Sequence, residues 1–191
     1  MSTLIVAFRA ASLAFFAAPL LLRIIGRAPG ARARARQSGA ARVPVLANFA
    51  AFGLFFPALV LFCASPEGQA ALILAASGCL LAMAGAAIIV RSRIELGSAW
   101  SFVPMTDKTA GLVVTGPYRL VRHPIYLGFL MLTAGEALAF ASWPAALVLL
   151  GAIVPSFVWR ARREDALLAR TFGERYELYR QKTRMIIPHL L

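Results

Sequence analysis

Pro124–Trp159, PIYLGFLMLTAGEALAFASWPAALVLLGAIVPSFVW, is a long apolar stretch with an interruption at Ser142-Trp143-Pro144. Proline inside a helix removes one hydrogen bond, and its ring meets the carbonyl four residues earlier. A membrane-spanning helix needs about 20 mostly apolar residues. The stretch therefore predicts a tight hairpin of two transmembrane helices, Pro124–Ser142 and Trp143–Trp159, in preference to one long helix.

The remainder of the chain is similarly apolar. Of the 191 residues, 60% are hydrophobic and only 15% are charged, and the mean hydropathy is +0.75. A soluble domain has about 45–50% apolar and about 25% charged residues, so this composition excludes a soluble globule. Three further stretches have the length of a spanning helix: Leu4–Ile25, Pro44–Ala64 and Gln69–Val90. The sequence predicts an all-α integral membrane protein with about five transmembrane helices.

Basic residues are confined to alternate connections between these stretches. Five, five and eight of the 20 Lys and Arg residues lie, respectively, in Gly26–Val43, in Arg91–His123 and in the tail from Arg160. The other two connections contain none. Since cytoplasmic loops carry the positive charge, we expect the N-terminus outside and the C-terminal tail in the cytoplasm of a bacterial inner membrane. The net charge of +12 then reflects the orientation of the protein in the membrane, where the basic loops lie next to anionic lipids. We expect no nucleic acid as partner. A cleaved signal peptide is the competing interpretation of the first stretch, but Arg23 follows the apolar run instead of preceding it.

Small residues are dense within the expected spans. Gly78, Ala82 and Ala86 recur every four residues, a spacing that allows two helices to approach closely. Cys63 and Cys79 have neither CxxC nor zinc spacing. We expect both cysteines to be buried small residues and expect no disulfide and no metal site.

Leu112–Gly128, LVVTGPYRLVRHPIYLG, is the first segment rich in functional side chains. We expect a short extended run, a turn at Gly116-Pro117 and then a helix with Pro124 in its first turn. The segment gathers five basic or aromatic side chains: Tyr118, Arg119, Arg122, His123 and Tyr126. Such residues commonly anchor a helix at the membrane surface, but His123 and two proline-fixed turns favour a binding site.

Trp159–Arg180 is the second such segment. Its pattern predicts a helix that leaves the membrane, breaks near Gly173 and continues as another amphipathic turn or two. Arg160 and Glu164 are four residues apart and share one face of this helix. They form either part of a site or a solvated ion pair worth only about 0.3–0.5 kcal/mol.

Short motifs follow one another in a particular order through the second half of the chain. They are Leu112-Val113, Gly116-Pro-Tyr-Arg119, Arg122-His-Pro-Ile-Tyr126, Glu164-Asp165, Phe172-Gly-Glu-Arg-Tyr176 with Tyr179, and Ile187-Pro188. This order resembles the isoprenylcysteine carboxyl methyltransferase family, part of a superfamily that includes phospholipid N-methyltransferases. The resemblance covers about residues 90–188. It divides the chain into residues 1–90, three spans with a basic cytoplasmic loop, and residues 91–191, a methyltransferase core.

The resemblance implies S-adenosylmethionine as methyl donor, in a pocket that the cytoplasmic tail covers. It implies donor contacts at ten positions: Ala110, Gly111, Leu112, Val113, Tyr118, His123, Pro124, Ile125, Tyr126 and Glu164. It also implies that Arg160 faces the substrate. Three positions depart from the eukaryotic pattern: Val103 replaces a glutamine, a histidine near Ala110 is absent, and Asp165 replaces the second glutamate.

The chemistry of these side chains agrees with such a donor. A carboxylate such as Glu164 can pair with an ammonium group or accept from ribose hydroxyls, and tyrosine rings offer flat apolar faces. Arg122 and Arg160 can hold carboxylates, which makes Arg122 a candidate donor ligand and Arg160 the candidate catalytic and substrate-orienting residue. An S-methyl sulfonium is already activated, so the enzyme must mainly align the acceptor.

Glu136 is an ionisable residue at membrane depth, which by default indicates function. It could pair with Arg9 on the first span, line the substrate pocket, or lie exposed near the outer interface. We include it among the candidate substrate-binding residues.

Several functions stay open at this stage. The leading hypothesis is a membrane methyltransferase whose lipophilic acceptor arrives from the bilayer. The alternatives are a phospholipid N-methyltransferase, an NADPH-dependent membrane reductase of the sterol or steroid type, and a small scaffold that binds anionic lipid. The sequence indicates neither the acceptor, nor O-, N- or S-methylation, nor the oligomeric state.

Overall fold

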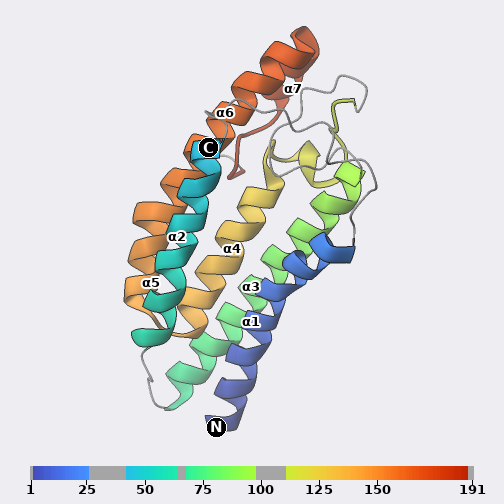
Figure 1. Cartoon of the computed structure of the whole chain (residues 1–191). Coiled ribbons are helices and arrows are strands. Elements are labelled where there is room, and N and C mark those ends of the chain that lie inside the picture. Colours follow the sequence, from blue (N-terminus) through green and yellow to red (C-terminus); the bar gives the residue numbers. More distant parts are fainter. Residues whose placement is uncertain (1, 26–41, 64–67, 98–110, 189–191) are drawn as a thin grey trace.

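The computed structural model describes residues 2–25, 42–63, 68–97 and 111–188, and the regular elements within these ranges are helices. The elements are α1 (Ser2–Ile25), α2 (Arg42–Leu61), α3 (Gly68–Leu96), the 3-10 turn η4 (Gly116–Arg119), α4 (Pro124–Ala139), α5 (Trp143–Val148), the π-turn η5 (Leu149–Ile153), α6 (Val154–Phe172) and α7 (Glu174–Lys182). The long helices lie side by side, and α7 lies at one end of the bundle (Figure 1). The predicted all-α class is confirmed for these residues.

Three of the helices are long and apolar enough to cross a membrane. They are Val43–Leu61, Gly68–Leu96 and the continuous helix Trp143–Phe172, while Thr3–Phe15 and Pro124–Ala139 are shorter apolar helices. Large apolar side chains on the outside of these helices, such as Leu54, Leu80 and Leu150, are more than half exposed. The architecture is therefore that of an integral membrane protein. The number of five spans stays a prediction.

The predicted hairpin is present, and its turn occupies Phe140–Ser142. Ala141 adopts a positive φ of 48°, which reverses the chain between α4 and α5. The Ser142 hydroxyl accepts a hydrogen bond from Ala145 N (3.4 Å) as the N-cap of α5 and donates to Ala58 O on α2 (3.0 Å). The turn is thus fixed both to its own helix and to a neighbour.

The second arm of the hairpin continues through α5, η5 and α6 as one helix. Pro155 cannot donate the backbone hydrogen bond that residue 151 would receive in an α-helix, and the widened turn η5 lies directly before it. The helix therefore accommodates the proline without ending and reaches Phe172, well beyond the expected apolar limit at Trp159.

Glycines allow α3 and α4 to pack with backbones almost in contact. A Cβ atom on Gly85 would lie 2.5 Å from Gly128 O, and one on Gly135 would lie 2.6 Å from Gly78 O. The predicted close approach around Gly78 and Ala82 is confirmed, and its partner is α4. This contact fixes the position of α4, whose first residues belong to the site.

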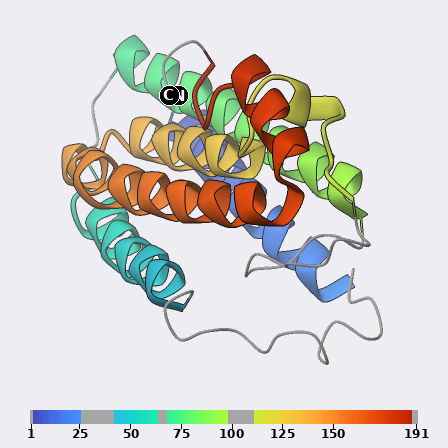
Figure 2. The same ribbon diagram turned by 90° about the horizontal axis from the view of Figure 1, so that it is seen from above.

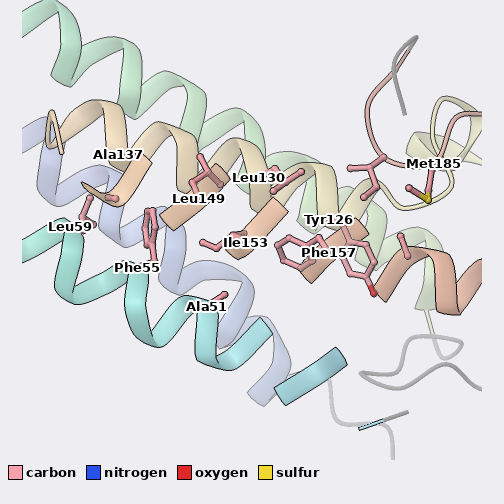
Figure 3. Packing of buried hydrophobic residues seen from close by; sticks show 13 residues of the cluster. Ala51, Phe55, Leu59, Tyr126, Leu130, Ala137, Leu149, Ile153, Phe157 and Met185 are labelled. Carbon is pink, nitrogen blue, oxygen red and sulfur yellow. The ribbon is translucent and has the colours of Figure 1, made fainter. Parts of the chain in front are cut away.

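A second packing surface joins α2 to the α5–α6 helix, while α1 lies against α3 and α4 (Figure 2). Phe55, Leu59 and Ile153 are fully buried in it, and Phe157 is nearly so. Figure 3 shows this apolar cluster running lengthwise to Tyr126 and Met185 at the site end.

The C-terminal segment returns to the start of α4. The predicted break is at Gly173, whose φ of 57° ends α6 before α7 begins. Beyond α7, Arg184 O accepts from Arg122 N (2.8 Å) and Met185 O accepts from His123 N (2.9 Å). This pairing brings α6, α7 and the start of α4 together at one end of the bundle (Figure 1).

Candidate active site

His123 lies immediately before α4, where Pro124 occupies the first helical turn as predicted. The preceding turn η4 begins at Gly116, whose φ is 58°. Glu95 at the end of α3 holds this turn by accepting from Thr115 Oγ1 (2.8 Å). His123 is only 7% exposed, so this histidine is a buried group with fixed partners.

The His123 ring lies between two consecutive acidic residues of α6. Nε2 is 2.7 Å from Asp165 Oδ1, and Nδ1 is 3.5 Å from Glu164 Oε2. Burial alone would lower the pKa of His123, but the hydrogen bonds and negative charges of Asp165 and Glu164 outweigh it and raise that pKa above its usual value. The two carboxylates therefore favour the protonated form of the His123 ring, which bridges them.

Glu164 is held from two further sides. Tyr126 OH donates to Oε1 (2.5 Å), and Arg160 Nε donates to the same oxygen (3.0 Å). The Arg160 guanidinium also lies over the Tyr126 ring, 5.4 Å from its centroid. The side chains of Arg160 and Glu164 are 12% and 16% exposed, so the interpretation of a solvated ion pair is wrong.

Asp165 connects the site to the C-terminal segment. Arg122 Nη2 and Nε lie 3.1 and 3.2 Å from Asp165 Oδ2, and Tyr176 OH donates to Oδ1. Arg122 Nη1 donates to Thr183 O (2.5 Å) and Arg180 O (3.2 Å). The guanidinium thus joins α6 to the residues that follow α7, and its role as a donor ligand stays a prediction.

The structure brings together five of the predicted site residues: Arg122, His123, Tyr126, Arg160 and Glu164. Tyr118 is buried beside them, and its carbonyl accepts from Tyr179 OH (2.7 Å). Pro124 starts α4, and Ile125 packs against the apolar core.

The segment Gly111–Val113 is irregular backbone before η4, with a φ of 72° at Gly111. No hydrogen bond or ion pair joins these described residues to Glu164 or Asp165, and their contacts to the donor stay a prediction. Ala110 and Val103 lie outside the described residues.

Three further residues join the cluster although the sequence did not place them among the site residues: Asp165, Tyr176 and Tyr179. Asp165 was noted only as a departure from the family pattern, although adjacent acids on a buried helix face were the available signal. Tyr176 and Tyr179 are three residues apart on α7, and their hydroxyls reach Asp165 and the Tyr118 carbonyl. Their rings pack edge to face, with centroids 6.0 Å apart.

Glu136 lies elsewhere, on α4 about 15 Å along the helix axis from Tyr126. It is completely buried, so the interpretation of exposure at an interface is wrong. Its Oε2 contacts Ser12 Oγ (3.1 Å), while Arg9 Nε donates to Ala139 O (3.0 Å). Arg9, the expected partner of Glu136, therefore donates to a backbone carbonyl three residues further along α4. The hydrogen-bond partner of the Glu136 carboxyl group is Ser12.

We expect Glu136→Gln to fold normally and Glu136→Ala to be destabilised by about 2–4 kcal/mol. Ser12 has one hydroxyl proton but approaches both Arg9 O (2.8 Å) and Glu136, so a Glu136 group that donates satisfies both contacts. A glutamine amide can donate in the same way, whereas alanine leaves a cavity between α1 and α4. Thermal unfolding of both variants in detergent measures the difference. Equal stability of the two variants would contradict this account.

The chain resembles known proteins over this same region. Residues 73–175 match the family model for phospholipid methyltransferases. The protein-S-isoprenylcysteine O-methyltransferase of Schizosaccharomyces pombe is 30% identical over 97 residues, which are 50% of this chain and 41% of that protein. The methanethiol S-methyltransferase of Pseudomonas sp. is 36% identical over 78 residues, 37% of this chain and 26% of that protein. Because the match to the family model covers more than half of the chain, the chain belongs to the phospholipid methyltransferase family.

The fold agrees with this membership. The solved structure of a eukaryotic intramembrane Ras methyltransferase, isoprenylcysteine carboxyl methyltransferase, superposes with a TM-score of 0.57 at 19% identity, covering 93% of this chain and 63% of that one. The matches in sequence, together with this shared fold, confirm the resemblance predicted from the motifs. The chain spans less than half the length of the two curated relatives described.

Proposed function

We propose that the protein is an S-adenosylmethionine-dependent methyltransferase of the membrane, which transfers a methyl group to the carboxylate of a lipophilic acceptor. The observation that carries the proposal is Glu164, a carboxylate held by His123, Tyr126 and Arg160 where the spanning hairpin reaches the end of the bundle. This cluster combines both charge signs with aromatic rings.

The donor set fits the methyl donor chemically. S-adenosylmethionine carries an ammonium and a sulfonium, which carboxylates and ring faces stabilise, and a carboxylate, which guanidinium groups bind. Glu164 supplies the carboxylate and Arg122 the guanidinium. The Tyr126 ring already stacks on His123 and on Phe157, with centroid distances of 5.3 and 4.9 Å, and it orients Glu164 through its hydroxyl. When bound, the donor supplies an activated methyl group, so no general base is required for a carboxylate acceptor.

Arg160 is the residue that we assign to the acceptor. It lies one turn closer to the apolar part of the helix than Glu164, and its guanidinium is oriented by both Glu164 and the Tyr126 ring. Competition between Glu164 and the acceptor for Arg160 keeps the ion pair with the acceptor from becoming too tight, which preserves the nucleophilicity of the acceptor oxygen.

The surroundings favour an acceptor that enters from the bilayer. Tyr126 stacks on Phe157 (4.9 Å) and Phe157 contacts Phe52 (6.1 Å), so apolar rings continue from the polar cluster toward the membrane interior. The basic tail favours a cytoplasmic site, with the N-terminus on the outer side of a bacterial inner membrane.

Methyl transfer from labelled S-adenosylmethionine into lipid extract and into prenylated carboxylic acids tests the proposal. We expect a base-labile labelled ester in the organic phase, identified by mass spectrometry. We also expect calorimetry to detect binding of S-adenosylmethionine and not of NADPH. Binding of NADPH alone would instead support a reductase, and label in a phospholipid amine would replace O- with N-methylation.

A further inference from the structure

Asn48 on α2 is a buried polar residue at the site end of the apolar cluster, and it has an unused hydrogen-bonding atom. The side chain is only 5% exposed, and its Nδ2 donates to Ser156 Oγ on α6 (3.1 Å). Its Oδ1 has no hydrogen-bond partner within the described part of the chain. A buried carbonyl oxygen without a partner is unfavourable by itself, which points to a ligand that completes it.

The orientation of the Asn48 amide is determined by its neighbour. Ser156 Oγ donates its single proton to Ile153 O (2.8 Å), so toward Asn48 it can only accept. The amide nitrogen must therefore face Ser156, and the unpartnered atom is the oxygen. Any ligand of this atom must bring an N–H or O–H group.

The position of Asn48 relates it to the acceptor rather than to the methyl donor. Ser156, Arg160 and Glu164 are spaced four residues apart and follow one face of α6, so Ser156 is about 6 Å from Arg160 along the helix axis, on the side away from Glu164. Phe52 lies one turn from Asn48 on α2. Its ring packs edge to face against Phe129 and Phe157, with centroid distances of 6.0 and 6.1 Å. Asn48 thus lies where the polar cluster meets the aromatic rings.

We propose that Asn48 determines acceptor specificity: its Oδ1 accepts a hydrogen bond from an N–H or O–H group in the acceptor head, next to the carboxylate that Arg160 orients. This inference rests on the proposed function for the role of Arg160. It narrows the acceptor to an acid that carries a hydrogen-bond donor between the carboxylate and an apolar tail.

Two matched pairs of acceptors test this inference. S-farnesyl-3-mercaptopropionic acid is N-acetyl-S-farnesylcysteine without its acetamido group, and hexadecanoic acid is 3-hydroxyhexadecanoic acid without its hydroxyl. We expect the parent to prefer the donor-bearing member of at least one pair by about 10- to 100-fold in kcat/KM, because the other member leaves Oδ1 unpaired. Asn48→Leu should abolish the preference by slowing the donor-bearing acceptor, with little effect on its partner.

Controls separate this role from a structural one. Phe49→Leu changes the neighbouring residue, which is 59% exposed on the same helix, and should retain the preference. Ser156→Ala frees the amide to rotate and should reduce the preference without abolishing methylation, which provides a second variant if Asn48→Leu folds poorly. Equal use of both members by the parent, or an undiminished preference in Asn48→Leu and Ser156→Ala, would overturn the inference.

Binding is measured separately from turnover, by calorimetry of the four acids with the purified protein. Selective binding that Asn48→Leu abolishes, without methylation, would support the Asn48 site while refuting the proposed methyltransferase. Methylation of both members of each pair at equal rates would support the proposed methyltransferase and refute the role of Asn48.

Discussion

Replacing Glu164 by glutamine is expected to lower kcat/KM for methyl transfer about 100- to 1,000-fold, and to weaken binding of S-adenosylmethionine. The substitution keeps the shape of the side chain but removes its charge, which Arg160 and His123 face at 3.0 and 3.5 Å. Removing one preorganised electrostatic partner from a water-poor site commonly has this effect. Initial rates with labelled donor, together with calorimetric binding of the donor, measure both quantities.

Glu177→Gln is the matched control for this experiment. Glu177 forms an ion pair with Arg180 (3.0 Å), but the two side chains are half exposed, so its loss should change kcat/KM less than about twofold. Unchanged donor binding in a well-folded Glu164→Gln protein would refute the assignment of the donor site.

Gly85→Ala is expected to destabilise the protein by about 3 kcal/mol, the upper end of the range for overpacked cores. The added Cβ would lie 2.5 Å from Gly128 O and 2.7 Å from Leu132 N, and both of these are backbone atoms that cannot rotate away. Relief requires α3 and α4 to separate, which also displaces the start of α4 next to His123. Thermal unfolding in detergent, followed by size-exclusion chromatography, measures the loss.

Gly53→Ala provides the opposite expectation on a neighbouring span. A Cβ at Gly53 meets nothing within 4 Å, so alanine should be neutral or stabilise α2 by about 0.5–1 kcal/mol through its higher helix propensity. If Gly85→Ala were as stable as Gly53→Ala, the tight helix contact would be refuted.

Local patterns predicted the helices and their ends because these depend on nearby residues. The hairpin turn just before Pro144, the helix start at Pro124 and the break at Gly173 follow from proline and glycine geometry. The spacing of Gly78 and Ala82 predicted a close contact but not its partner, since the spacing is a property of one helix only. Which helix packs there depends on the matching glycines of α4.

The sequence predicted which residue types form the site, but it predicted only a part of the contacts between them. His123 and Glu164 are separated by 41 positions in the sequence, and no local pattern shows that they meet. The role of Asp165 was missed because it depends on Arg122 and Tyr176, which reach it through the return of the C-terminal segment. Asn48 belongs to no sequence motif. Its side-chain oxygen is recognised as lacking a hydrogen-bond donor among the described residues only from the structure, where Ser156 fixes the orientation of the amide.

The pairing of Arg184 and Met185 with the start of α4 has a consequence for biosynthesis. The ribosome synthesises the hairpin before these residues, so the partners of Arg122 and of the His123 amide become available after the hairpin itself. The inserted helices exist for an interval with buried charges that lack these partners. The hydrogen bonds that hold Arg122 and His123 to the C-terminal segment therefore form only after translation has passed Met185.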